Sequence, residues 1–237
     1  IVDDLTSNYM NFIYAESEWI VRFIIPVAVP YISGGSPAEE YSIPWQVRVE
    51  INGGRCGGTL ISNRHILTAA HCFEHGKASF VVVGGHYIDD DSDGVRHNVC
   101  KTSIHPKWDE WTREFDFAVL HLETPVELGP RAVPACLPAQ RLDGGWDGLD
   151  WMETGRTMTV SGWGLLAPDK YETPNELYMV KVPGVSDERC KDMHRDFTRR
   201  FGIHITDNML CAGDNQNTNR DANTGDSGGL LCNCPDS

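Results

Sequence analysis

Short apolar runs separated by turn residues dominate the chain from Ile32 onward. Val, Ile, Leu and Thr gather in strand-sized segments bounded by Gly, Asn, Asp and Pro, at 45–51, 57–62, 65–70, 79–85, 117–123 and 158–164. Runs of this length and composition are typical of strands. Helical periodicity is weak, and one short helix is expected over Asp187–His194, after a Ser186 cap. The pattern predicts an all-β protein of the sandwich or barrel type.

Two changes of pattern divide the chain. Residues 1–31 have mixed polarity followed by an apolar, proline-interrupted stretch, and we interpret them as a leader or propeptide-like segment. The proline-spaced stretch 125–138 is expected to link two halves of the remaining domain, 32–237. The first half is expected at about 32–128 and the second at about 139–237.

Composition and charge narrow the class of protein. The formal net charge of −14 disfavours nucleic-acid binding, because phosphates would repel such a surface. No apolar run reaches the roughly 18 residues of a membrane helix, so no membrane partner is expected. The eight cysteines are even in number and too scattered for a zinc ribbon. They predict disulfides formed in an oxidising compartment, and therefore a secreted, extracellular protein.

The acidic segment 88–94 has two interpretations. Asp89, Asp91, Asp93 and Gly94 match the first half of an EF-hand calcium loop, but the twelfth position is Cys100, where a bidentate Glu is required. A solvated acidic turn is the preferred interpretation, and no metal is expected.

Three separated motifs hold one candidate for each role in nucleophilic catalysis. His71 is followed by Cys72 at the end of the run LTAAHC. Asp116 stands between two Phe residues, and Ser227 lies among glycines in GDSGG. A serine hydroxyl is a weak nucleophile until a base removes its proton and a third group orients that base. Glycines allow the tight turn that exposes Oγ and aims N–H groups at an oxyanion. Each residue alone is ordinary, but the three motifs together favour nucleophilic catalysis.

These motifs resemble the chymotrypsin/trypsin family of serine proteases. The resemblance is carried, in the family's order, by ISGG (32–35), CGGTLISNRHILTAAHC (56–72), DFAVLHL (116–122), SGWG (161–164) and GDSGG (225–229). It covers about 200 of the 237 residues and implies two antiparallel six-stranded Greek-key β-barrels. It also implies polypeptide substrates, protein protease inhibitors as further partners, a monomer and no cofactor.

The resemblance gives each matching residue a role. His71 would be the general base and acid, Asp116 its orienting partner and Ser227 the nucleophile. The N–H groups of Gly225 and Ser227 would form the oxyanion hole.

Activation and specificity also follow from the resemblance. Asp226 would pair with the new ammonium group of Ile32 after cleavage of the Tyr31–Ile32 bond, although family zymogens are usually cut after Arg or Lys. Asp221, six residues before Ser227, matches the position that floors the specificity pocket of trypsin-like members. A carboxylate there attracts Arg or Lys side chains, and an ordinary polar loop is the alternative. The expected activity is endopeptidase cleavage after Arg or Lys.

The cysteines follow the family pattern only in part. The resemblance implies the disulfides Cys56–Cys72 and Cys190–Cys211. Asn223 and Met158 stand where the family usually has cysteines. Three pairings therefore remain open for the other four, which are Cys100, Cys136, Cys232 and Cys234.

The sequence ends soon after the serine motif, whereas the family's domain continues. We therefore expect a C-terminally truncated member whose second barrel lacks its last strands and terminal helix. A barrel closes only when its final strands pair with its first, so residues 32–237 alone are expected to be essentially inactive on an arginine ester. A catalytically impaired homologue that acts as a secreted binding protein is the alternative function.

Overall fold

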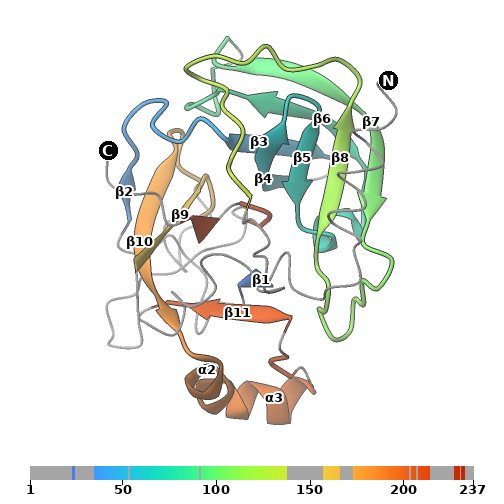
Figure 1. Cartoon of the computed structure of the whole chain (residues 1–237), viewed down its shortest axis with the longest axis vertical. Helices are drawn as coiled ribbons and strands as arrows, with labels where there is room; N and C mark the ends of the chain where they lie inside the picture. Colours follow the sequence, from blue (N-terminus) through green and yellow to red (C-terminus); the bar gives the residue numbers. More distant parts are fainter. Residues whose placement is uncertain are drawn as a thin grey trace, which may run out of the picture.

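Strands make up most of the regular structure in this computed structural model (Figure 1). The structure describes residues 23–24, 35–52, 54–90, 92–137, 157–165, 173–202, 204–206, 208–213, 227–229 and 231–232. They form one closed six-stranded barrel, a second six-stranded sheet and two short α-helices. The predicted all-β class is therefore confirmed. Within these ranges no helix has the length and apolar character needed to cross a membrane.

The closed barrel is antiparallel throughout, in the order β3-β4-β5-β8-β7-β6. Its strands are β3 (Gln46–Ile51), β4 (Gly54–Ser62), β5 (His65–Thr68), β6 (Ala78–Val83), β7 (Val95–Ile104) and β8 (Ala118–Leu122). Successive side chains of a strand point to opposite faces. One set therefore fills the barrel with fully buried apolar residues, among them Val47, Val49, Leu60, Ile66, Val81 and Leu120.

The second sheet is smaller and, within the described residues, open. Its order is β1-β11-β10-β9-β12, with β2 also paired to β10. Its strands are β1 (Phe23–Ile24), β2 (Ser36–Pro37), β9 (Thr157–Gly162), β10 (Tyr178–Val185), β11 (Met209–Ala212) and β12 (Leu231–Cys232). The pairing of β1 with β11 is parallel, so a piece of the predicted leader adds a strand to this sheet.

Direct bonds join the two halves. The indole N–H of Trp163, just past β9, donates to the main-chain oxygen of His86 at 2.9 Å. The buried hydroxyl of Ser161 donates to Gln46 Oε1 at 2.7 Å. An apolar cluster at the same junction unites Ile88 with Leu177. These contacts fix the second sheet against the outside of the barrel.

The stretch predicted as a linker packs on the barrel. Val126 and Ala132 are buried in the barrel core, and the N–H of Ala135 donates to Leu60 O at 2.8 Å. Over the described residues 125–137 this stretch is therefore a fixed part of the first half.

Two short helices lie at the end of the second sheet that is far from the barrel (Figure 1). The predicted helix is present as α2 (Asp187–Met193), although the Ser186 side chain makes no capping hydrogen bond. A disulfide from Cys190 to Cys211 ties α2 to β11. The second helix, α3 (Arg195–Phe201), was not predicted, and it ends at Gly202 in the left-handed conformation (φ 72°).

The acidic segment contains a buried carboxylate, which corrects the prediction of a solvated turn. Asp93 is 6% exposed. Its Oδ2 accepts the main-chain N–H groups of His86 and Tyr87 at 2.5 and 2.6 Å, and its Oδ1 accepts the Tyr41 hydroxyl at 3.1 Å. Buried main-chain donors need such partners. Asp93 therefore stabilises the turn by accepting these N–H groups.

We expect Asp93→Ala to lower the free energy of unfolding by about 3 kcal/mol. The substitution removes a charged acceptor and leaves buried N–H groups without a hydrogen-bond partner. Urea unfolding followed by tryptophan fluorescence measures this loss. The control is Asp90→Ala, which removes an exposed turn carboxylate that accepts the main-chain N–H and the hydroxyl of Ser92. Equal stability of the two variants would contradict this role for Asp93.

A pair of histidines lies across β5 and β8. His65 and His121 are register partners, and their ring centroids are 5.0 Å apart with the rings nearly perpendicular. The Ser62 hydroxyl bonds His65 Nδ1 at 2.7 Å, and the Ser103 hydroxyl bonds His121 Nε2 at 3.1 Å. Burial, followed by the charges of His65 and Lys101, lowers the pKa of His121 from 6.5 to about 4. Burial also lowers the pKa of His65.

Stability should therefore fall on acidification. The unfolded chain takes up a proton at His121 near pH 6.5, whereas the folded chain does so only near pH 4. The free energy of unfolding is then at its full value above pH 6.5 and decreases as the pH falls toward 4. We expect His121→Gln to lose less stability than the parent between pH 7.5 and 5, with exposed His75→Gln as control. Identical losses in all three proteins, measured by urea unfolding, would contradict the prediction.

Candidate active site

His71 lies at the mouth of the barrel, where β5 gives way to a single 3-10 turn, η1 (His71–Phe73). The Cys56–Cys72 disulfide, with Cα atoms 6.4 Å apart, ties this turn to β4. The His71 side chain is 33% exposed, so one edge of the imidazole remains open to solvent or to a ligand.

Asp116 is brought to His71 by the pairing of β5 with β8. The antiparallel register runs from His65↔His121 to Thr68↔Ala118, which places the residues after β5 beside those before β8. Asp116 Oδ2 lies 2.6 Å from His71 Nδ1, and Oδ1 accepts the His71 main-chain N–H at 2.8 Å. With its proton on Nδ1 the ring donates to the carboxylate, and the lone pair of Nε2 is left to accept a proton.

The Asp116 side chain is largely buried, at 11% exposed. Phe115 adopts a positive φ of 54°, which costs about 1–2 kcal/mol for an L-residue. Its ring stacks on His105 with centroids 4.8 Å apart, and Phe117 is 5% exposed. The two Phe residues that flank Asp116 in the sequence are thus both packed against neighbouring side chains.

The loop before Asp116 is held at both sides of the site. Arg113 forms an ion pair with Glu74, just after η1. Asn208, from the second half, donates to Glu114 Oε1 at 3.2 Å. Sequence reasoning missed these residues, since single charged side chains in a polar loop carry no pattern. The one available signal was the density of charged residues at 107–114.

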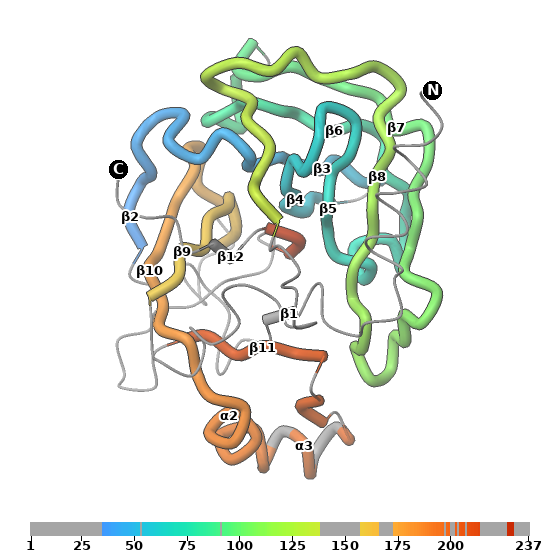
Figure 2. The backbone as a smooth tube through the Cα atoms, in the orientation of Figure 1, coloured from blue at the N-terminus to red at the C-terminus, as the bar shows by residue number. Residues whose placement is uncertain are grey.

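The main chain of Ser227 lies against the segment that carries His71. Its carbonyl oxygen accepts the Gly57 N–H at 2.7 Å and lies 3.9 Å from Cys72 Sγ, part of the disulfide beside His71. In Figure 2 the red segment 227–229 accordingly lies next to β4 and β5. The structure thus places all three predicted triad residues in one region, where strands of both halves meet.

Gly228 allows this close approach. Its φ is 85°, and a Cβ built there would lie 2.3 Å from Thr68 Oγ1 and 2.6 Å from Gly57 O. Thr68 itself donates to Gly57 O at 2.8 Å, so both neighbours are fixed. Only glycine fits between them.

Comparison with known proteins identifies the family. Residues 32–234 match the family model described as Trypsin. The chain belongs to the trypsin family of serine proteases.

Individual trypsin-family relatives are similar over most of the chain. Serine protease filzig of Drosophila melanogaster is 36% identical over 213 residues, which are 84% of this chain and 12% of that protein. Venom serine protease Bi-VSP of Bombus ignitus is 34% identical over 215 residues, 84% of this chain and 56% of that protein. The chain thus spans 12% to 56% of the length of these relatives.

A solved trypsin-family structure shares the fold. Neuropsin, a serine protease expressed in the limbic system of mouse brain, matches with a TM-score of 0.64 and 27% identity. The match covers 84% of this chain and 82% of neuropsin.

Several of the predicted site residues are not described by the structure. Ile32, Asp221, Gly225 and Asp226 lie outside the described residues, as does Cys234. Among the described residues the disulfides are Cys56–Cys72 and Cys190–Cys211, the two that the family pattern implies. Cys100 and Cys136 carry exposed free thiols.

One cluster has the composition of a metal site. Ligand atoms of Cys190, His194 and Cys211 lie within 4.8 Å of one another. The two cysteines are bonded to each other, however, and only free thiolates bind zinc strongly. The cluster is therefore a covalent anchor for α2.

Proposed function

We propose that the chain is the peptidase domain of a trypsin-like serine endopeptidase. The observation that carries this proposal is the double contact of the Asp116 carboxylate with His71, at the ring Nδ1 and at the main-chain N–H. This contact orients the ring and fixes its tautomer, which a general base needs. The approach of the Ser227 main chain to Cys72 supports the assignment of the nucleophile.

The first half-reaction is acylation. Ser227 Oγ attacks the scissile carbonyl carbon while its proton passes to His71 Nε2, and the resulting oxyanion accepts hydrogen bonds from the N–H groups of Gly225 and Ser227. As the C–N bond breaks, His71 gives the same proton to the leaving amine. The products are an acyl-enzyme ester on Ser227 and a new amino terminus.

Deacylation repeats the steps with water. His71 Nε2 takes a proton from water, whose oxygen attacks the ester carbon, and the proton then returns to Ser227 Oγ as the ester bond breaks. Asp116 stays ionised throughout and stabilises the imidazolium. Cleavage before Ile32, and an ion pair between the new ammonium group and Asp226, would arrange the oxyanion loop.

A fluorophosphonate probe tests the proposal, because it reacts with an activated serine even in a chain whose turnover of substrate is low. We expect one equivalent of probe on the chain, located at Ser227 by peptide mass mapping, and no labelling of Ser227→Ala or His71→Ala. Near-UV circular dichroism checks that all three proteins are folded. A folded parent chain that stays unlabelled, before and after cleavage at Tyr31–Ile32, would contradict the proposal and favour the secreted, catalytically impaired binding protein.

The specificity proposal rests on Asp221. A pocket carboxylate forms charge-assisted hydrogen bonds with Arg or Lys, worth about 1.5–3 kcal/mol. We expect Asp221→Ser to lower kcat/KM for arginine esters by at least about tenfold while aromatic esters change little. Equal use of Arg and Phe substrates by the parent protein would contradict this role.

Secretion is part of the proposal. Two disulfides among the described residues fit an oxidising compartment. The substrates would then be extracellular polypeptides, with protein protease inhibitors as further partners and a monomer as the working form.

A further inference from the structure

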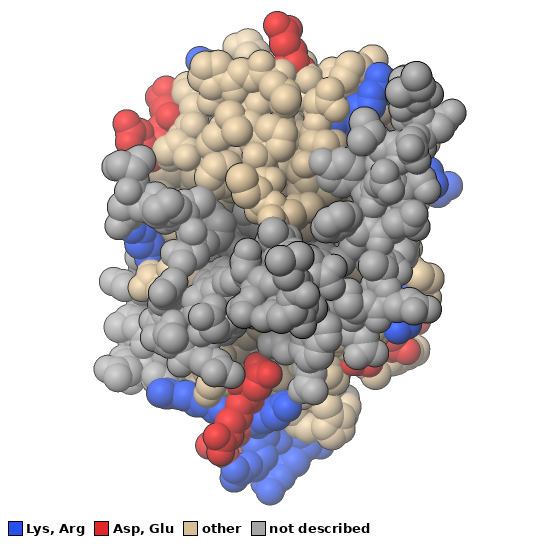
Figure 3. Space-filling view, in the orientation of Figure 1, with Lys and Arg blue, Asp and Glu red and all other residues tan. Residues whose placement is uncertain are grey.

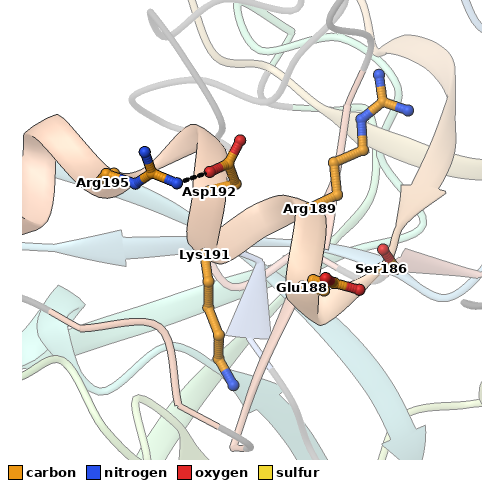
Figure 4. Close-up of a pocket in the computed structure, with 6 residues that line it drawn as sticks. All are labelled: Ser186, Glu188, Arg189, Lys191, Asp192 and Arg195. Atoms are coloured by element: carbon orange, nitrogen blue, oxygen red, sulfur yellow. Dashed lines mark hydrogen bonds and ion pairs between the residues drawn. The ribbon is translucent and has the colours of Figure 1, made fainter.

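The hollow beside α2 and α3 holds charges of both signs. It has a volume of about 540 Å³ and is lined by Ser186, Glu188, Arg189, Lys191, Asp192 and Arg195 (Figure 4). Arg195 already pairs with Asp192, and acidic and basic side chains lie together over this end of the molecule (Figure 3). These charges offset one another, so the hollow selects no class of ligand.

The turn that carries Asp116 is a more informative feature. It lies in the loop between β7 and β8, and it closes where the N–H of Phe117 donates to Phe115 O at 2.7 Å. Asp116 is the single residue between them. Phe115 has a positive φ of 54°, which is strained for an L-residue. Strained backbone persists only where surrounding contacts fix it, so this turn needs support from outside itself.

One imidazole contacts the turn on both sides of Asp116. The His105 ring stacks on the Phe115 ring, with centroids 4.8 Å and planes 15° apart. The same ring meets the Phe117 ring at 4.5 Å, with planes tilted by 43°. The main-chain N–H of His105 also donates to Phe117 O at 3.1 Å. Aromatic rings at these distances attract one another, so His105 supports the strained turn.

The His105 ring acts here as a neutral aromatic group. Its Nδ1 accepts the main-chain N–H of Lys107 at 3.2 Å, which places the ring proton on Nε2. Burial, followed by the charge of Lys107, lowers the pKa of His105 below its ordinary value of 6.5. A phenyl ring at this position keeps both ring contacts, whereas a methyl group or an amide does not.

We infer that His105 is a positioning residue for the pair of Asp116 and His71. By packing against Phe115 and Phe117 it fixes the turn that presents the carboxylate to His71. The result is the double contact of Asp116 with the His71 ring at 2.6 Å and with its main-chain N–H at 2.8 Å. The inference rests on the proposed peptidase function for its catalytic meaning, but the contact itself is observable without turnover.

Exchange of the His71 Nδ1 proton with water tests the inference in the full 237-residue chain labelled with ¹⁵N-histidine. Bonding to Asp116 slows this exchange, and local opening speeds it. His105→Ala should speed exchange by at least about tenfold, and His105→Gln, which keeps an acceptor for Lys107 but lacks the ring, should do the same. His105→Phe should stay within about threefold of the parent rate.

Phosphonate labelling of Ser227 is the second measurement. A small displacement at a reacting group can cost about 10² in rate, so His105→Ala should label at least about tenfold more slowly than the parent. His105→Phe should restore most of the parent rate. Rescue by a ring without nitrogen would assign the effect to the ring contacts.

The matched control is His121→Ala. It removes another half-buried imidazole of the same barrel, packed edge to face on His65 with centroids 5.0 Å apart. It should leave both measurements unchanged, and near-UV circular dichroism checks the fold of each variant.

Three outcomes would overturn the inference. They are parent-like exchange in His105→Ala and His105→Gln, fast exchange in His105→Phe, and equal effects of His105→Ala and His121→Ala. A parent chain that takes no phosphonate, while its His71 Nδ1 proton exchanges slowly and responds to His105→Ala, would contradict the proposed function and support the positioning role.

Discussion

Asp116→Asn should slow phosphonate labelling of Ser227 by about 10⁴-fold at neutral pH. The amide can still accept the His71 main-chain N–H, which the carboxylate accepts at 2.8 Å. Its NH₂ group, however, donates to Nδ1, and the ring proton must then move to Nε2. The imidazole loses the lone pair that should take the serine proton, so the loss arises from the tautomer alone. The rate is measured by intact mass over time.

The matched control for this variant is Asp109→Asn. Asp109 lies in the same loop, where its Oδ1 accepts the N–H groups of Trp111 and Thr112 at 2.9 and 2.8 Å. An amide oxygen can replace that acceptor, so labelling should stay within about twofold of the parent rate. A labelling rate for Asp116→Asn within tenfold of the parent would contradict the role of Asp116.

Gly228→Ala should cost at least about 10²-fold in the same assay. The added Cβ would lie 2.3 Å from Thr68 Oγ1, more than 1 Å inside ordinary van der Waals contact, and the φ of 85° disfavours any L side chain. Thr68 and Gly57 are fixed in the barrel, so the serine loop must move. A displacement of about 1 Å at a reacting group can cost 10² in rate.

A second glycine separates the site effect from general loss of stability. A Cβ at Gly129 meets nothing within 4 Å, so Gly129→Ala should label at the parent rate. Thermal unfolding of both variants shows whether the barrel is intact. Normal labelling by Gly228→Ala would mean that the serine loop does not depend on its contact with the barrel.

Burial explains which strands could be predicted. β3 and β5 are buried along most of their length, and their apolar runs predict them. β7 is mostly exposed and polar, so its pattern was weak. β10 was missed because it contains Pro183, and proline is rare inside strands. α3 was missed because its residues lack an apolar period.

The sequence likewise predicts some features of the candidate site and not others. His71 and Asp116 could be predicted because each lies in a motif that the family shares. The contacts that position the site join residues far apart in sequence, such as Gly57 with Ser227 and Glu114 with Asn208. No local pattern encodes such pairs. Asp93 was misjudged because an acidic run suggests solvent, whereas the turn folds this carboxylate inward to satisfy main-chain donors.

The most direct test of the proposed catalytic machinery is a crystal structure of the phosphonate adduct. The adduct should be a covalent bond from phosphorus to Ser227 Oγ, with His71 Nε2 about 3 Å from the adduct oxygen and Asp116 still bonded to Nδ1. An adduct on another residue would contradict the account. So would an adduct on Ser227 with the His71 ring more than about 6 Å away, since no proton could then pass directly between them.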